Sequence, residues 1–237
     1  MSTTPTRSFT IIFALITLLE MIGDTLHIRW LHYGSKPLIM ALLFLYVWQH
    51  YRLAGSPHII RWLMIGMVFA LLGDVFLMIR EVDLFALGLG SFLIMQLCYC
   101  RAFWLLIYRA KQPLRVQTLW KTSVPFLIYD LAFLILLYPV FVNNPSLTPL
   151  WWPVVIYVFC LSTMGLLATQ VDRFQLHDLL NRGSLVVGAL LFILSDSAIA
   201  IDKFLHPIPG ATWVVMTTYA AAQYLIVVGL VQQTSPA

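Results

Sequence analysis

Apolar residues fall into long, nearly unbroken blocks along this chain, and short polar segments separate the blocks. Each block holds roughly 17–25 residues, the length that a helix needs to cross the hydrocarbon layer of a membrane. A helix pairs its own backbone groups in lipid, so blocks of this kind predict membrane-spanning helices and not strands. We expect eight spans, at approximately residues 9–26, 38–53, 59–79, 84–107, 120–138, 150–170, 184–201 and 211–231.

Residues that interrupt helices support these divisions. Proline lacks a backbone N–H and glycine carries a high conformational entropy, so both weaken a helix in its interior. They occur between the blocks at Gly34 and Pro37, Gly55 and Pro57, Pro113, Pro145 and Pro149, Gly183, and Pro207 through Gly210. The second block is the shortest, and we expect its span to begin close to Lys36 and Pro37.

Composition excludes a water-soluble fold. Of the 237 residues, 61% are hydrophobic and 10% are charged, whereas a soluble domain carries roughly 25% charged residues. Cys98, Cys100 and Cys160 all fall inside apolar blocks, so we interpret them as small buried residues and not as a disulfide framework. The prediction is an all-α, polytopic membrane protein in which residues 1–237 form a single transmembrane domain.

The distribution of basic residues predicts the orientation of the spans. Cytoplasmic segments carry an excess of Lys and Arg, and the excess falls on the N-terminal side of the membrane, at Arg7, Arg52, Arg61, Arg109, Lys111, Arg115, Lys121, Arg173 and Arg182. The opposite side holds only Arg29, Lys36, Arg80 and Lys203. We therefore expect both termini in the cytoplasm, in the inner or plasma membrane of a cell. The net charge of +4 lies in these short segments and does not indicate a nucleic-acid partner.

A weak internal repeat relates the third and seventh blocks. Gly66 precedes Asp74 in the string GMVFALLGD by the same interval that separates Gly188 from Asp196 in GALLFILSD. A repeat offset by four spans keeps the two helices pointing the same way. The halves, approximately 9–107 and 120–231, would then be two parallel four-helix repeats with a central cavity between them.

Four carboxyl side chains inside the predicted spans stand out as candidates for a function, namely Glu20, Asp74, Asp130 and Asp196. Ionisable groups are costly in a membrane and usually face a cavity or a partner. The repeat places Asp74 and Asp196 at similar depth, so we expect a catalytic pair in which one is a protonated acid and the other an ionised base. Asp130 is equally consistent with a hydrogen bond between helices. Glu20 and the nearby Asp24 fit a supporting role at the mouth of the cavity.

Several polar side chains are candidates for binding a substrate. Lys36 lies on the side of the membrane toward which the two aspartates lean, where it fits either a phosphate ligand or an interface anchor. Other donors and acceptors stand at Gln96, Tyr99, Ser195, Tyr219 and Gln223. The alternative for each of these is a hydrogen bond between packed helices.

Motifs of the common zinc and serine hydrolases are absent from the sequence. No pair of histidines has the HExxH spacing of zinc hydrolases, and no GxSxG string marks a serine nucleophile. His27 and His32 beside the outer acids are a minor alternative for a metal site; otherwise we expect no metal and no cofactor. The residues alone fit a small-molecule or proton-coupled transporter as well as a hydrolase, because both use carboxylates in mid-membrane. A non-catalytic lipid-binding protein is a third alternative.

Four strings resemble the YhhN family, which includes the lysoplasmalogenases of animal membranes. They are SKPLIMALL (35–43), ALLGDVFLM (70–78), GALLFILSDSAIAIDKF (188–204) and YAAAQYLIVVG (219–229), and they occur in the family's order. The resemblance implies an eight-span enzyme whose substrate is a lysophospholipid. The enzyme would hydrolyse the vinyl ether bond of lysoplasmalogens to a fatty aldehyde and glycerophospho-ethanolamine or -choline.

The resemblance also implies roles for particular residues. It points to Asp74 and Asp196 as the acidic pair, with Lys36, Tyr219 and Gln223 in matching positions. One departure is Gln96, which stands where many relatives carry a histidine. Glutamine does not exchange a proton near neutral pH, which puts a proton-shuttling role at this position in doubt.

Overall fold

The computed structural model describes residues 4–51, 57–79, 81–110, 116–173 and 183–234, and within these residues the chain forms helices and no strand. The predicted all-α fold is confirmed for this part of the chain. The α-helices are α1 (Arg7–Thr25), α2 (Arg29–Tyr51), α3 (Pro57–Met78), α4 (Phe85–Arg109), α5 (Val116–Asn143), α6 (Trp151–Arg173), α7 (Ser184–Ala200) and α8 (Ala211–Thr234). A short 3₁₀-helix, η1 (Thr148–Leu150), precedes α6, and a short π-helix, η2 (Ile201–Leu205), continues α7.

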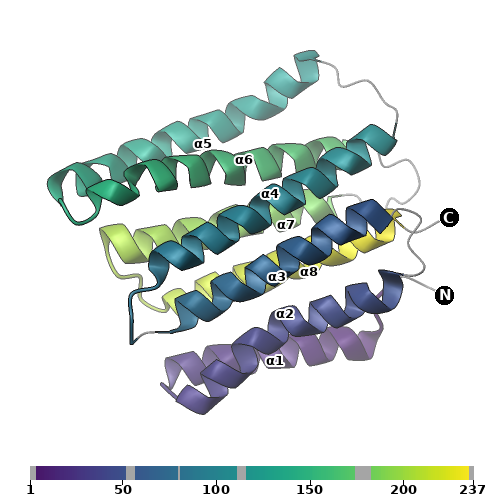
Figure 1. The fold of residues 1–237 in the computed structure, drawn as a ribbon, viewed down its shortest axis with the longest axis horizontal. Helices are drawn as coiled ribbons and strands as arrows, with labels where there is room; N and C mark the ends of the chain where they lie inside the picture. Colours follow the sequence, from purple (N-terminus) through teal and green to yellow (C-terminus); the bar gives the residue numbers. More distant parts are fainter. Residues whose placement is uncertain (1–3, 52–56, 80, 111–115, 174–182, 235–237) are drawn as a thin grey trace.

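The helices lie side by side, and successive helices run in opposite directions (Figure 1). The pair α1 and α2 forms one edge of the molecule, and the pair α5 and α6 forms the other. The helices α3, α4, α7 and α8 lie between these pairs, with α3 packed most extensively on α4 and α7 on α8. The start of α1 and the end of α8 lie at the same end of the bundle (Figure 1). This order places the helices that carry Asp74 and Asp196 at the centre.

Seven of the described helices are long and apolar enough to cross a membrane, as expected of an integral membrane protein. The second predicted span is the one that does not meet this criterion. Its helix α2 begins at Arg29, nine residues before the predicted start, and it contains Pro37. The expectation that Gly34 and Pro37 separate two spans is therefore wrong. Membrane helices tolerate an internal proline because neighbouring groups can satisfy the freed carbonyl.

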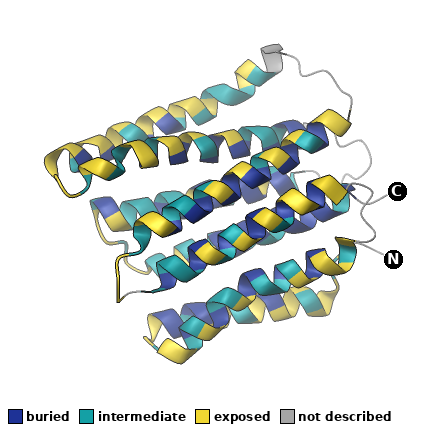
Figure 2. Ribbon diagram, viewed as in Figure 1, coloured by how far each residue is buried: buried dark blue, intermediate teal, exposed yellow. Residues whose placement is uncertain are grey.

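The surface of the bundle is apolar along its outward faces (Figure 2). On α5, for example, the large side chains of Ile128, Leu131 and Ile135 are each more than 60% exposed. Exposed apolar area on this scale would be unfavourable in water, and it fits contact with lipid. The main buried core lies instead between the central helices α2, α3, α4, α7 and α8, and α1 and α6 also contribute residues to it.

Glycines bring the central helices into close contact. A Cβ atom on Gly66 of α3 would lie 2.6 Å from the ring of Tyr99 on α4. A Cβ atom on Gly188 of α7 would lie 2.9 Å from Ile226 and 3.1 Å from the Ala222 carbonyl oxygen on α8. Small residues let membrane helices approach closely. Each glycine thus sets the spacing of a helix that carries one of the two central aspartates.

Candidate active site

Asp74 lies in the protein interior between α3 and α8. Its side chain is 4% exposed, and the hydroxyl of Tyr219 donates a hydrogen bond of 2.7 Å to its Oδ2 atom. The Tyr219 ring packs against Phe92 and Phe192, with centroid separations of 5.9 and 5.8 Å. Asp74 therefore has one specific donor within an aromatic and largely apolar environment.

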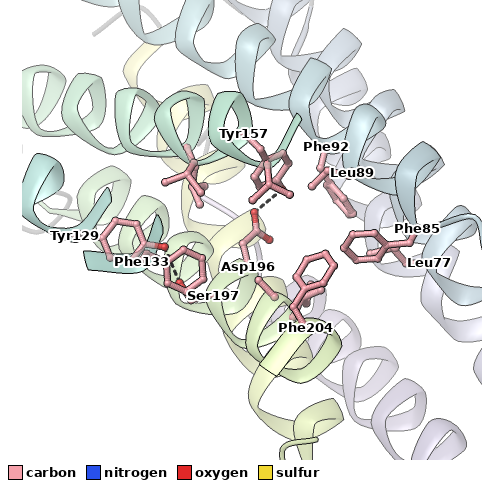
Figure 3. A pocket seen from close by; sticks show the side chains of 15 residues that line it. Leu77, Phe85, Leu89, Phe92, Tyr129, Phe133, Tyr157, Asp196, Ser197 and Phe204 are labelled. Atoms are coloured by element: carbon pink, nitrogen blue, oxygen red, sulfur yellow. Dashed lines mark hydrogen bonds between the residues drawn. The ribbon is translucent and has the colours of Figure 1, made fainter. Parts of the chain in front are cut away.

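Asp196 on α7 has two donors from other helices. The hydroxyl of Tyr157 on α6 donates a bond of 2.5 Å to Oδ2, and Nε2 of Gln96 on α4 lies 3.5 Å from the same oxygen. Figure 3 shows the carboxyl group of Asp196 pointing toward Tyr157, with the hydrogen bond between them at the wall of a pocket. The sequence interpretation missed Tyr157, because it is one aromatic residue among many in an apolar run. Its role becomes visible only when α6 is packed against α7.

The two aspartates belong to one electrostatic cluster. The charge of Asp74 acts on Asp196, and the charges of Lys36 and Glu20 act on Asp74. Charges interact over longer distances in an apolar interior than in water, because the effective dielectric constant is lower. The structure thus brings together side chains from α1, α2, α3 and α7 that lie far apart in the sequence.

A small apolar pocket lies against Asp196. It has a volume of about 40 Å³, and its wall is built mainly from Leu77, Leu89, Phe92, Phe133 and Phe204. The few polar groups at its wall are those of Asp196, Tyr129, Tyr157 and Ser197 (Figure 3). A wall of this kind suits a hydrocarbon chain, and it exposes a carboxyl group to that chain at one point.

A larger polar cavity adjoins the apolar pocket. It has a volume of about 530 Å³ and lies where α1, α3 and α7 end and α4 and α8 begin. Its charged lining residues are Glu20, Asp24, Lys36, Asp83, Asp202 and Lys203. Both hollows are lined by Leu77, Phe85 and Ile199, so these three side chains form a shared wall. One elongated molecule with a charged end and an apolar end could occupy both.

Asp74 itself lines neither of these two hollows. It lies about one helical turn from Leu77, a residue of the shared wall. Of the predicted binding residues, Lys36 lines the polar cavity, and Tyr219 and Gln96 contact the two aspartates.

Four other predicted binding residues form buried bonds between helices. Tyr99 on α4 donates to Oε1 of Gln223 on α8 at 2.9 Å. Ser195 on α7 donates to the Val215 carbonyl oxygen on α8 at 3.1 Å. Asp130 on α5 accepts a hydrogen bond from Ser162 on α6. None of the four lines the apolar pocket or the polar cavity.

The predicted supporting residues, Glu20 and Asp24, meet a histidine. Nδ1 of His32 lies 3.2 Å from Oε1 of Glu20 and 3.6 Å from Oδ1 of Asp24. Thr212 on α8 donates a bond of 2.5 Å to Oδ2 of Asp24. Within the described ranges, no group of three or more His, Cys, Asp or Glu side chains has the arrangement of a metal site.

Comparisons with known proteins match most of the chain. The model of the YhhN family matches residues 31–230. Lysoplasmalogenase TMEM86A of Bos taurus is 34% identical over 177 residues, and the Homo sapiens protein of the same name is 32% identical over 178 residues. Each match covers 73% of this chain and 66% of the relative, so the chain spans just under two thirds of their length.

A shorter match has higher identity. Lysoplasmalogenase TMEM86B of Homo sapiens is 50% identical over 54 residues, which is 23% of this chain and 24% of that protein. No solved structure matches the chain.

Proposed function

Because the chain belongs to the YhhN family, we propose that it is a membrane-embedded hydrolase of lysoplasmalogens. The reaction would use water to cleave the vinyl ether bond of the substrate. Its products are a fatty aldehyde and glycerophospho-ethanolamine or -choline. Similarity to relatives named lysoplasmalogenase supports this assignment.

One observation carries the proposal, namely a carboxyl group exposed to an apolar pocket that adjoins a charged cavity. A lysoplasmalogen has a single hydrocarbon chain joined through the vinyl ether to a zwitterionic phosphate headgroup. We place the part of the chain next to the vinyl ether in the apolar pocket, whose volume of about 40 Å³ holds only a short stretch of it. We place the headgroup in the polar cavity, where Lys36 and Lys203 offer positive charge to the phosphate. The vinyl ether then lies near the shared wall and near Asp196.

The reaction begins with transfer of a proton to the β-carbon of the vinyl ether. This step leaves a positively charged oxocarbenium centre at the α-carbon, as in glycoside hydrolysis. We assign the proton to Asp196, because its carboxyl group faces the pocket that would hold the alkenyl chain. Tyr157 and Gln96 donate to the oxygen that gains negative charge when the proton leaves, which stabilises the transition state.

Water then adds to the α-carbon, and a carboxylate takes up the proton that the water loses. The product is a hemiacetal, which collapses to the aldehyde and the free hydroxyl group of the glycerol. We propose Asp74 as the second carboxylate, since two carboxyl groups in one region of low dielectric constant tend to hold a single proton between them. Carried out in D₂O, this sequence places one deuterium on the aldehyde carbon next to the carbonyl.

We further propose that all eight helices span the membrane, with both termini in the cytoplasm. Helix α2 has 23 residues and packs against α1. It runs along the bundle in the same way as the seven more apolar helices do (Figure 1). Two parallel four-helix repeats account for the matched packing of α3 on α4 and of α7 on α8. The matched contacts of Gly66 and Gly188 support the same repeat.

The function can be tested with purified protein in detergent micelles. Aldehyde and glycerophospho-ethanolamine should appear in equal amounts when lysoplasmenylethanolamine is added. A transporter needs two compartments and releases no aldehyde in micelles, so an absence of products would contradict the proposal. Glu81→Gln is a suitable control variant, because Glu81 is an exposed acid that lines neither the apolar pocket nor the polar cavity.

A further inference from the structure

Glu20 is a buried acid without a hydrogen-bond donor. Its side chain is fully buried, and neither carboxylate oxygen has a hydrogen-bond partner among the described residues. Burial of a carboxylate is unfavourable unless donors surround it. Glu20 also lines the polar cavity, so a molecule bound there can supply the missing donors once the carboxylate turns toward it.

The neighbours of Glu20 do not supply the hydrogen-bond donors that its buried carboxylate needs. Oε1 of Glu20 lies 3.2 Å from Nδ1 of His32 without forming a hydrogen bond of acceptable geometry. Asp24 is the second acid of the cluster and lines the same cavity, whereas His32 does not. Even a protonated His32 balances only one of the two negative charges. The cluster can therefore attract a cation that enters from the cavity.

We propose that Glu20 and Asp24 bind the primary ammonium group of an ethanolamine headgroup, while Lys36 binds the phosphate of the same headgroup. This inference rests on the proposed function and names its preferred substrate class. Glu20, Asp24 and Lys36 all line the same polar cavity, so one headgroup can reach both the acids and the lysine. The two acids then lie beside the positive ammonium group, and Lys36 lies beside the negative phosphate.

The chemistry of the cluster distinguishes ethanolamine from choline. A primary ammonium group carries three N–H donors, which can satisfy the bare oxygens of Glu20. The trimethylammonium group of choline has no N–H, and proteins usually hold it in a cage of aromatic rings. Phe76 and Phe85 are the aromatic residues that line the cavity, and Phe85 already faces the ammonium group of Lys203 at 5.2 Å. The site therefore selects a primary amine.

Binding of lipids that cannot be hydrolysed tests this selection. The probes are two lysolipids with the same saturated ether chain and either an ethanolamine or a choline headgroup, added to the full chain in detergent. We expect the Kd to be at least about tenfold lower for the ethanolamine lipid, which corresponds to one charge-assisted contact. Glu20→Gln should remove the preference, whereas Glu81→Gln, an equal loss of charge at an exposed site, should keep it.

Several results would overturn the inference. These are equal affinity for the two lipids in the unchanged protein, failure of both lipids to bind, or a preference that survives in a folded Glu20→Gln variant. The first two need no variant, so a misfolded variant leaves the test intact. Aldehyde release separates this inference from the proposed function. Equal hydrolysis of the two headgroup classes would refute the subsite alone, whereas selective binding without aldehyde release would refute the hydrolase alone.

Discussion

Removal of the Tyr157 hydroxyl isolates the contribution of one hydrogen bond to the proposed proton transfer. Tyr157→Phe keeps the aromatic ring, which is buried between α6 and its neighbours, and deletes the donor that lies 2.5 Å from Oδ2 of Asp196. Gln96, at 3.5 Å, then remains as the donor to this oxygen. The geometry of the apolar pocket should change little, because no larger group is introduced.

The expected loss follows from the charge that develops on Asp196. Transfer of the proton to the substrate leaves a carboxylate, and a hydrogen bond to a charged group contributes about 1.5–3 kcal/mol. Since about 1.4 kcal/mol corresponds to a factor of ten in rate, kcat should fall by about tenfold to about 150-fold. KM should change less, because the bond strengthens in the transition state and not on binding.

The assay is release of aldehyde from lysoplasmenylethanolamine in micelles, with the variants checked for intact folding. Tyr138→Phe provides a matched control, since Tyr138 is an exposed tyrosine of α5 that does not line the apolar pocket. A double variant with Asp196→Asn should be no slower than Asp196→Asn alone, because the tyrosine acts through the aspartate. A kcat for Tyr157→Phe within twofold of the unchanged protein would refute this reasoning.

Two further changes give separate predictions. Lys36→Met should raise KM for the lysolipid by about tenfold, since one charge-assisted contact to phosphate is lost. The control Lys121→Met, on the exposed surface, should leave KM unchanged. Equal KM values in the two variants would contradict a role of Lys36 in binding phosphate. Gly73→Ala should lower the stability in detergent by about 1–3 kcal/mol through overpacking, because the new Cβ lies 2.7 Å from the Phe92 ring. Gly90→Ala is its control, with no atom within 4 Å of the new Cβ, and an equal loss of thermal stability in both would contradict the packing argument.

The sequence predicts most of the helices because the thickness of the membrane sets the length of each apolar block that crosses it. The start of α2 was not predictable in this way. Residues 29–37 include Arg29, Gly34, Lys36 and Pro37, which together resemble a loop. The helix continues through them because it packs along α1, and its Lys36 side chain lines the polar cavity.

The candidate site was predictable only in part. Asp74 and Asp196 stand out because an acid in an apolar block has few reasons to be there other than a function or a specific partner. Tyr157 carries no such signal, since tyrosine is common near membranes and its partner depends on how α6 and α7 pack. Glu20 was identified as an acid of the cavity mouth, but its lack of a hydrogen-bond donor is a property of the folded protein alone.

The most direct test of the two-aspartate mechanism compares the unchanged protein with Asp196→Asn and Asp74→Asn in the aldehyde assay. Each substitution keeps the size of the side chain and removes the group that gives or takes a proton. We predict that both folded variants lose activity by about 100-fold or more, the contribution expected of a general acid or base, while Glu81→Gln keeps full activity. Aldehyde release that is indifferent to both aspartate substitutions would contradict it.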